Sequence, residues 1–205
     1  MPKKKRAYHH GDLRNTLMAA AVQLMNERQS VNFGIKDICD VAGVVPAAAY
    51  RHFSSKNAIL AEIAGEGFVK FHASLASASA KPANQPLRRL SALFSAYVEF
   101  ALAHPILYQI MFQYDVGNFL EFPHVLMSAQ KGFNVLNDLV KECAEAGLLR
   151  DRQVNEISMS LWSASHGLSV LLMGGRLQTT CGFSPADAKA AATRVSRDLI
   201  QGLLK

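Results

Sequence analysis

The sequence is poor in the residues that build disulfide frameworks, metal centres and membrane spans. It has three cysteines in 205 residues, Cys39, Cys143 and Cys181, far apart and odd in number. They fit small apolar residues in a reducing cytoplasm better than a disulfide framework. No His, Cys and Glu cluster has metal-ligand spacing, and no apolar run approaches the roughly 18 residues of a membrane span. We therefore expect no metal, no cofactor and no membrane partner.

The first ten residues, MPKKKRAYHH, carry a basic run with no apolar segment after it. This is not the pattern of a signal peptide, so we expect a cytoplasmic protein. Residues 1–10 are predicted to form a flexible basic arm that follows DNA phosphates or enters a minor groove, with a solubilising tail as the alternative. The basic residues of this arm are Lys3, Lys4, Lys5 and Arg6.

Positive charge is concentrated in the first quarter of the chain. Residues 1–56 hold nine Lys and Arg against four Asp and Glu, whereas the remainder holds thirteen against twelve, for a net charge of +6. A basic end beside a nearly neutral body is typical of a protein that neutralises nucleic-acid phosphates. The alternative is a basic membrane-binding surface, but no strongly basic amphipathic helix accompanies the charge.

The segment IKDICDVAGVVPAAAYRHFSSK, residues 35–56, predicts a helix-turn-helix. In its first half Ile35, Ile38, Cys39 and Ala42 recur at helical spacing and form one inward face. Gly43 follows where the chain must turn sharply, because glycine tolerates a positive φ.

The second half of this segment has the composition of a helix that enters a major groove. Pro46 suits the first helical turn, and Ala49 and Phe53 face the core. Ala47, Ala48, Arg51 and His52 are left on the outward side. Pro46, Ala47 and Ala48 are expected to contact thymine methyls, and Arg51 or His52 to donate to guanine.

Three stretches of the first sixty or so residues follow one another as a pattern: HHGDLRNTLMAAAVQLM as a first helix, KDICDVAGV as a second helix and turn, and AAYRHFSSKNAIL running into a fourth helix. In this pattern the chain resembles the tetracycline-repressor (TetR) family of bacterial regulators. The resemblance implies phosphate contacts by Tyr50 and Lys56, to which we add Lys36. Gly34 and Val45 stand where the family usually has Ser or Thr; glycine is an acceptable helix cap and valine is not.

Every later segment reads as helical, so we expect an all-α fold of about nine helices. A three-helix DNA-binding domain, residues 11–56, would precede a ligand-binding and dimerisation domain, residues 57–205. The last two helices are expected to be separated by a Gly- and Thr-rich loop. The predicted helices of the second domain span residues 56–78, 87–103, 106–112, 121–146, 154–173 and 185–204.

The C-terminal half resembles a ligand-domain subclass of the same family that is marked by Trp, His and Gly in the penultimate helix. Here these residues are Trp162, His166 and Gly167. A mid-helix glycine suggests that another backbone packs close to it. The resemblance implies a homodimer formed by the last two helices of each chain. The expected interface residues are Leu168, Leu172, Val195, Leu199 and Leu203.

Aromatic residues and methionines of the middle helices are candidates to line an apolar ligand pocket. Plain core packing is the alternative for each of them. Tyr97, Tyr108, Trp162 and His166 would supply the polar groups that orient a ligand. The expected pocket residues are Phe71, Phe94, Tyr97, Tyr108, Met111, Phe112, Phe133, Trp162 and His166.

These features predict a ligand-responsive repressor that binds a palindromic double-stranded operator as a dimer and is released by a small, partly apolar effector. An activator of the same fold and a nonspecific architectural DNA-binding protein are the alternatives. A helical enzyme or carrier built on His166 would need a nucleophile or metal cluster that no motif supplies. We therefore expect no catalytic residues.

Overall fold

The computed structural model describes residues 12–80, 84–112 and 121–204. Over these residues the fold is all-α, as predicted, with ten α-helices and one short 3-10 helix. The basic arm with Lys3, Lys4, Lys5 and Arg6 lies outside the described residues. The expected number of about nine helices was one too few, because the stretch predicted as a loop before the last helix contains the helix α9 (Arg176–Cys181).

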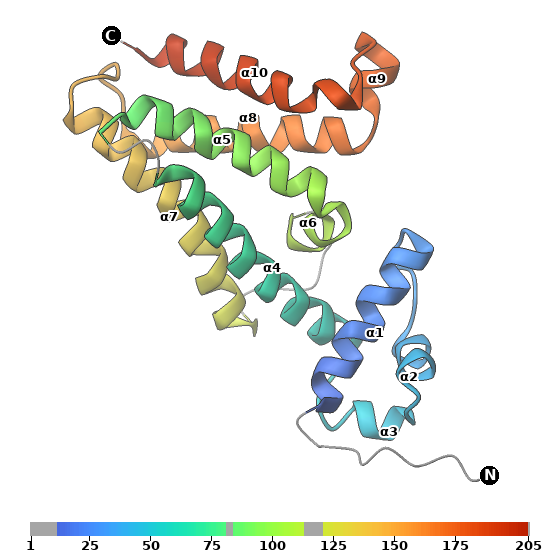
Figure 1. Ribbon diagram of the computed structural model, residues 1–205. Coiled ribbons are helices and arrows are strands. Elements are labelled where there is room, and N and C mark those ends of the chain that lie inside the picture. The colour runs from blue at the N-terminus through green and yellow to red at the C-terminus, as the bar shows by residue number, and fades with distance from the viewer. Residues whose placement is uncertain (1–11, 81–83, 113–120, 205) are drawn as a thin grey trace.

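Three helices form the N-terminal unit and seven form the rest, as arranged in Figure 1. The N-terminal unit consists of α1 (Asp12–Arg28), α2 (Ile35–Ala42) and α3 (Pro46–Ala49). The long helix α4 (Lys56–Ser79) leads from this unit into the larger body. The other helices are α5 (Pro86–Ala103), α6 (Pro105–Phe112), α7 (Pro123–Glu145), α8 (Val154–Met173), α9 and α10 (Ala188–Leu203), which follows the 3-10 turn Pro185–Asp187.

Capping residues and prolines set the ends of the central helices. The Ser55 hydroxyl accepts from the Ala58 N–H at 3.1 Å and caps α4 where the sequence predicts it. Pro105 and Pro123 begin α6 and α7, since a proline lacks the N–H that the first helical turn leaves unbonded anyway. Helices α5 and α6 therefore meet at a sharp bend of 108°.

Helices α4 and α7 lie side by side and approach closely at two glycines. A Cβ atom on Gly65 of α4 would lie 3.3 Å from Val125 of α7, and one on Gly132 of α7 would lie 3.3 Å from Phe71 of α4. Gly65 of α4 thus makes room for a side chain of α7, and Gly132 of α7 makes room for a side chain of α4. The pair therefore packs as a unit that runs from the N-terminal helices into the body.

One expectation about α8 does not hold within the chain. Gly167 was expected to allow close approach of another backbone, yet a Cβ atom placed there would meet nothing within 4 Å. This side of α8 is open in the single chain.

No described helix is by itself long and apolar enough to cross a membrane. The bent pair of α5 and α6 is the one combination that passes this test of length and composition.

Candidate DNA-reading surface and ligand cavity

A left-handed glycine makes the turn between α2 and α3. Gly43 has φ of 69°, and its N–H donates to the Asp40 carbonyl, while the Val44 N–H donates to Cys39 at 3.0 Å. These bonds close the end of α2, and a side chain at this φ would be strained. Ile38 and Cys39 are fully buried beneath the turn. The predicted helix-turn-helix geometry is thus produced by local backbone conformation and by the inward face of α2.

An aspartate takes over part of the capping role at the start of α2. The Gly34 N–H donates to Asp37 Oδ2 at 2.7 Å, and Arg28 of α1 donates to Asp37 Oδ1 at 2.7 Å. The Gly34 hydrogen bond, followed by that of Arg28, lowers the pKa of the Asp37 carboxyl. The charged Asp37 carboxylate therefore ties α1 to α2 and binds the backbone N–H of Gly34, the residue that stands where the family usually has a hydroxyl.

The recognition segment, residues 46–53, is shorter as a helix than its sequence predicts. Helix α3 ends at Ala49, and the chain continues as a turn in which the Phe53 N–H donates to the Ala49 carbonyl at 3.0 Å. Val45, which is 67% exposed, offers no side-chain cap at its start. A helix of four residues without a side-chain cap is not stable on its own. The segment is therefore held in place by the packing of the buried Ala49 and Phe53.

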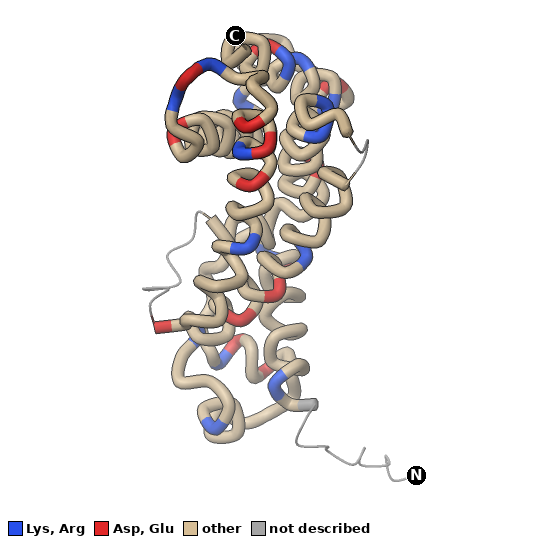
Figure 2. Tube along the Cα trace, turned by 90° about the vertical axis from the view of Figure 1, so that its left-hand side faces the viewer, with Lys and Arg blue, Asp and Glu red and all other residues tan. Residues whose placement is uncertain are grey.

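The predicted DNA-contacting residues are only partly on one outward surface. Pro46, Ala47, Tyr50 and Arg51 are exposed, as is Lys36 on α2, whereas Ala48 and His52 are half-buried. Helix α3 lies at the end of the molecule farthest from α10 (Figure 1), and basic positions mark this end in Figure 2. The structure therefore presents one aromatic side chain, Tyr50, and one guanidinium, Arg51, at a protruding surface.

Lys56 has an intramolecular role that the sequence does not reveal. Its ammonium donates to the Val31 carbonyl at 3.1 Å and lies 5.5 Å from the centre of the Phe33 ring. It thereby holds the loop before α2 against the start of α4. Its expected phosphate contact stays a prediction.

A cavity of about 410 Å³ lies between α4, α5, α7 and α8, with the end of α6 as part of its wall. Most of the expected pocket residues line it: Phe71, Phe94, Tyr97, Met111, Phe112, Phe133 and Trp162. Residues not expected there also line it, mainly aliphatic neighbours on the same helical faces: Leu75, Leu90, Leu93, Leu136 and Leu161. Helical spacing from Phe94 and Tyr97 could have identified Leu90 and Leu93.

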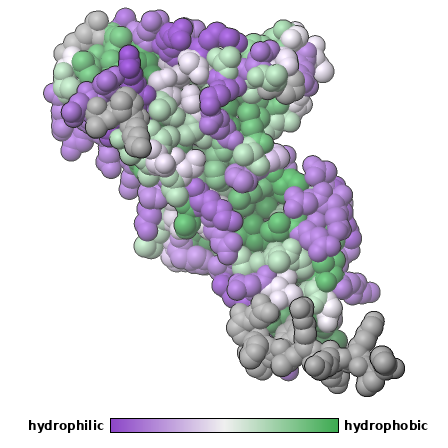
Figure 3. Space-filling model, viewed as in Figure 1, coloured by the Kyte–Doolittle hydropathy of each residue, from purple (hydrophilic) through white to green (hydrophobic). Residues whose placement is uncertain are grey.

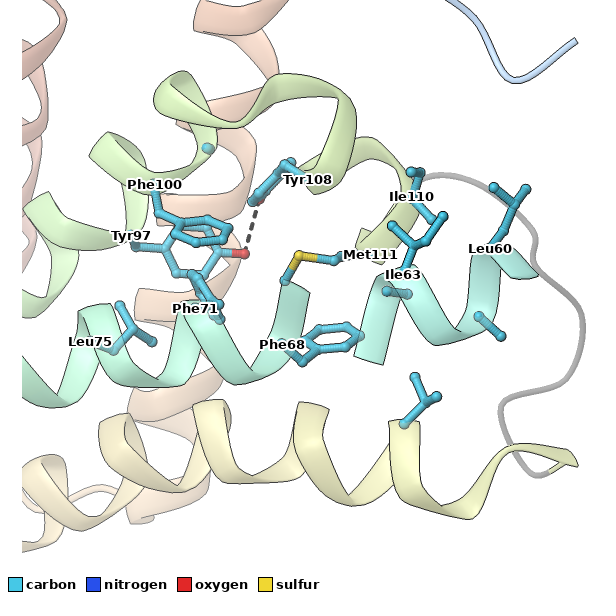
Figure 4. Close-up of a cluster of buried hydrophobic side chains, with 14 of the residues drawn as sticks. Leu60, Ile63, Phe68, Phe71, Leu75, Tyr97, Phe100, Tyr108, Ile110 and Met111 are labelled. Carbon is cyan, nitrogen blue, oxygen red and sulfur yellow. Dashed lines mark hydrogen bonds between the residues drawn. The ribbon is translucent and has the colours of Figure 1, made fainter. Parts of the chain in front are cut away.

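Tyr108 and His166 were expected to line the cavity, and the structure places them behind its wall instead. Tyr108 is fully buried and donates to the Tyr97 hydroxyl at 3.0 Å, as Figure 4 shows. The His166 Nδ1 atom lies 2.7 Å from the Tyr108 hydroxyl and 3.2 Å from that of Tyr97. Trp162 donates its indole N–H to Tyr97 at 3.3 Å. Tyr97 therefore connects the cavity wall to a polar cluster beneath it.

The polar cluster is uncharged. Burial raises the pKa of Tyr97 to about 12, raises that of Tyr108 as well, and lowers that of His166. None of the described side chains that line the cavity is ionisable to a charge near neutral pH. A bound molecule would thus meet an apolar wall with neutral hydrogen-bonding groups.

The residues expected at a dimer interface pack largely within the chain. Leu168, Leu172, Val195 and Leu199 are half-buried against a small cluster of Phe94, Val98 and Ala192. Leu203, at 9% exposure, is buried and has almost no surface left for a partner, which corrects its expected role. The more exposed apolar residues of α8 are Met159, Trp162 and Leu171, at 58%, 39% and 40% exposure.

A second hollow of about 600 Å³ lies between α1, α4 and the start of α6. Apolar residues of α1 and α6, such as Val22 and Leu107, line it together with polar residues of α1 and α4 and with His104, which precedes α6. The space-filling view shows a hydrophobic surface in this central part of the molecule (Figure 3). This groove separates the N-terminal unit from α6.

Family comparisons agree with both parts of the structure. Residues 17–63 match the family described as bacterial regulatory proteins, tetR family, and residues 90–199 match the tetracyclin repressor-like C-terminal domain. A comparison with curated proteins finds no match.

Solved structures share the fold over nearly the whole chain. A protein of unknown function from Rhodococcus sp. RHA1 is 26% identical, with a TM-score of 0.79 over 98% of this chain and 100% of the other. The fatty acid degradation regulator FadR from Bacillus halodurans is 19% identical, with a TM-score of 0.70 over 98% of each chain. PfmR from Thermus thermophilus is also 19% identical, with a TM-score of 0.69 over 93% of this chain and 96% of the other. Matches to both halves of the chain, joined in one helical fold with an exposed recognition segment, show that it is a DNA-binding transcriptional regulator of the TetR family and not an enzyme.

Proposed function

We propose that this regulator is a ligand-responsive repressor that binds an inverted-repeat operator as a homodimer and is released by a small, largely apolar effector. The observation that carries the proposal is the cavity, because one of its walls is α4, the helix that follows the recognition segment directly in the chain. A molecule that moved α4 would move the recognition segment with it. An activator that uses the same coupling is the second candidate.

The chemistry of the cavity indicates which effectors to test. Its size is within the usual range for drug-sized ligands, and its described lining carries no charge. A buried ion without a partner is costly, so we expect an uncharged hydrocarbon or aromatic body with one hydrogen-bonding group. Tyr97, Gln130 and Ser165 supply polar atoms in the lining. Since a similar structure is that of a fatty acid degradation regulator, fatty acyl esters and amides belong in the first screen.

The dimer is proposed to form through α8 and α10, as in the Trp-His-Gly subclass that the C-terminal sequence resembles. Support comes from the exposed Met159 and Leu171 and from the open space beside Gly167. Small residues on a helix face let a partner helix approach closely. The half-buried side of Leu168, Leu172, Val195 and Leu199 would complete this interface.

In this dimer each recognition segment would enter one major groove. Arg51 is proposed to read a guanine, and Pro46 and Ala47 to contact thymine methyls, because all three are exposed. Tyr50, Lys36 and Lys56 are proposed to contact phosphates and so to fix the position of the segment. Lys3, Lys4, Lys5 and Arg6 would add to the affinity for DNA, and the effector must bind the released form more tightly than the DNA-bound form.

The proposal is tested by selecting genomic fragments with the purified protein at moderate salt and sequencing them. We expect a few sites that share an inverted repeat, and reporter transcription that is low until an effector is added. Fragments without a common motif would contradict specific binding and favour an architectural protein. Reporter transcription that rises when the protein binds would favour the activator.

The cavity is tested with a bulky substitution in its wall. Leu93→Trp should fill the space and abolish release by the effector while operator affinity is unchanged. Met127→Trp, which adds an indole at a position on α7 that is 58% exposed, is the matched control and should respond as wild type. An unchanged response of the Leu93→Trp protein would place the effector elsewhere.

A further inference from the structure

The carboxylate of Glu62 on α4 is held from both sides at the junction of the N-terminal unit with the body. Arg14 of α1 donates to Glu62 Oε1 at 2.8 Å, and His124 Nε2 of α7 lies 3.0 Å from the same oxygen. The Glu62 side chain is 21% exposed, whereas those of Arg14 and His124 are 44% and 57% exposed. One partly shielded oxygen thus connects three helices.

Arg14 extends this connection to the recognition segment. Its guanidinium carbon lies 5.1 Å from the centre of the Phe53 ring, and Phe53 is 4% exposed. Phe53 ends the segment that carries Tyr50 and Arg51, and its N–H is bonded to the Ala49 carbonyl. A guanidinium stacked on an aromatic ring and bonded to a carboxylate is restrained in both position and orientation.

His124 extends the connection to the wall of the cavity. It lies in the first turn of α7, one turn or more before Gln130 and Phe133, which line the cavity. Its neighbour Val125 packs on Gly65 of α4, close to Glu62 in the sequence. His124 and Glu62 are therefore on the two helices that pack as a unit and form part of the cavity wall.

We propose that Glu62 is a positioning residue that sets the orientation of the recognition segment relative to the body, through Arg14 on one side and His124 on the other. The buried side chains of α1 and α4 are mainly apolar, and apolar contacts are not directional. Hydrogen bonds to a shared carboxylate are directional and resist rotation of α1 about α4. This inference rests on the proposed dimer, in which that orientation determines the spacing of operator half-sites that both segments can reach.

The test measures affinity for the selected operator and for two versions with one base pair added to or removed from the centre. One base pair rotates a half-site by about 35° around the DNA, since a turn takes about 10 to 10.5 base pairs. Wild type should bind the original spacing best. The spacing penalty is the factor by which affinity falls when one base pair is added or removed. In the Glu62→Ala protein we expect this factor to be about threefold to tenfold smaller than in wild type.

A matched control and a rescue separate positioning from general stability. Glu66→Ala removes an exposed carboxylate one turn further along α4 that has no ion pair within the described residues, and should keep the wild-type spacing preference. His124→Ala changes an exposed side chain and should reduce the penalty by a smaller factor than Glu62→Ala. His124→Gln retains an N–H donor and should restore the preference.

The outcomes distinguish this inference from the proposed function. The positioning role is supported if the penalty for altered spacing falls in the Glu62→Ala protein, falls less in the His124→Ala protein and is restored in the His124→Gln protein. If Glu62→Ala weakens binding to all three operators equally, the role is merely structural and the inference is overturned. A wild-type protein with no spacing preference would overturn both the proposed dimeric operator complex and the inference that rests on it.

Discussion

Two tyrosines illustrate how differently the two ends of the molecule are built. Tyr50 in the recognition segment is 55% exposed, while Tyr97 in the cavity wall is 3% exposed and bonded to three other side chains. The N-terminal unit presents its functional groups outward on a small core of buried side chains. The body directs them inward around a hollow. Function at a surface leaves the interior free to pack densely, whereas function in a cavity requires packing to be given up.

The two regions also differ in how their functional segments are held in place. The recognition segment of the N-terminal unit has a four-residue helix and no side-chain cap, so it depends on Phe53, Arg14 and the core beneath it. Four of the helices that form the cavity wall, α4, α5, α7 and α8, have 18 to 24 residues and support each other along their length. The first region is therefore the more sensitive to single changes in packing.

The largest expected effect is on the free energy of unfolding, when a buried side chain of the N-terminal unit is shortened and compared with one in the cavity wall. Ile38→Ala removes a fully buried side chain of α2 and should lower the free energy of unfolding by about 2 to 5 kcal/mol. Leu93→Ala in the cavity wall should cost less, because one side of Leu93 already lacks contacting atoms. Urea unfolding of both variants measures the difference, and equal losses would show that the cavity is packed as tightly as the N-terminal core.

The next effect concerns the outward surface. Arg51→Ala should weaken binding to the selected operator by about 1 to 3 kcal/mol and relax the preference at one base position. Tyr97→Phe should leave operator affinity in the absence of effector unchanged, because Tyr97 is buried in the body. Competition binding with single-base operator variants provides the measurement. Uniform weakening on all sequences by Arg51→Ala would assign this side chain to phosphate rather than to a base.

A smaller effect is expected where the recognition segment lacks a cap. Val45→Thr places a hydroxyl at the exposed N-cap of α3 and should stabilise the protein by about 1 kcal/mol, because an N–H of the first turn gains an acceptor. Thermal unfolding of Val45→Thr, with Val45→Ala as control, tests this expectation. A gain shared by both variants would mean that removing an exposed valine, and not capping, is responsible.

The smallest effect is a pH dependence that arises in the body. Burial lowers the pKa of His166 in the folded protein, whereas the unfolded chain titrates at about 6.5. The unfolded state therefore binds a proton that the folded state lacks, so stability should fall as pH drops below about 6.5 and level off below the lowered folded pKa. His166→Gln should flatten this part of the curve. An unchanged slope in the variant would assign the dependence to other histidines.

Much of the architecture could be predicted from local patterns. The Ser55 cap, the glycine turn at Gly43 and the bounds of α8 agree with the sequence, because caps, positive φ and helical periodicity are local properties. The short α9 was missed, since Gly175 and Gly182 at its two ends indicate a loop until their left-handed conformations are seen to cap a helix. Dimer residues and DNA contacts remain predictions, because both depend on partners.

The amino-acid sequence by itself determined the all-α class, the helix-turn-helix and the family, since these depend on spacing along a single helix or turn. Only the tertiary structure decided that Tyr108 and His166 stand behind the cavity wall, that Lys56 binds a carbonyl, and that Glu62 joins three helices. The physical reason is that periodicity specifies which residues face inward but not what they meet there. Their contacts are determined by how helices that are distant in the sequence pack against each other.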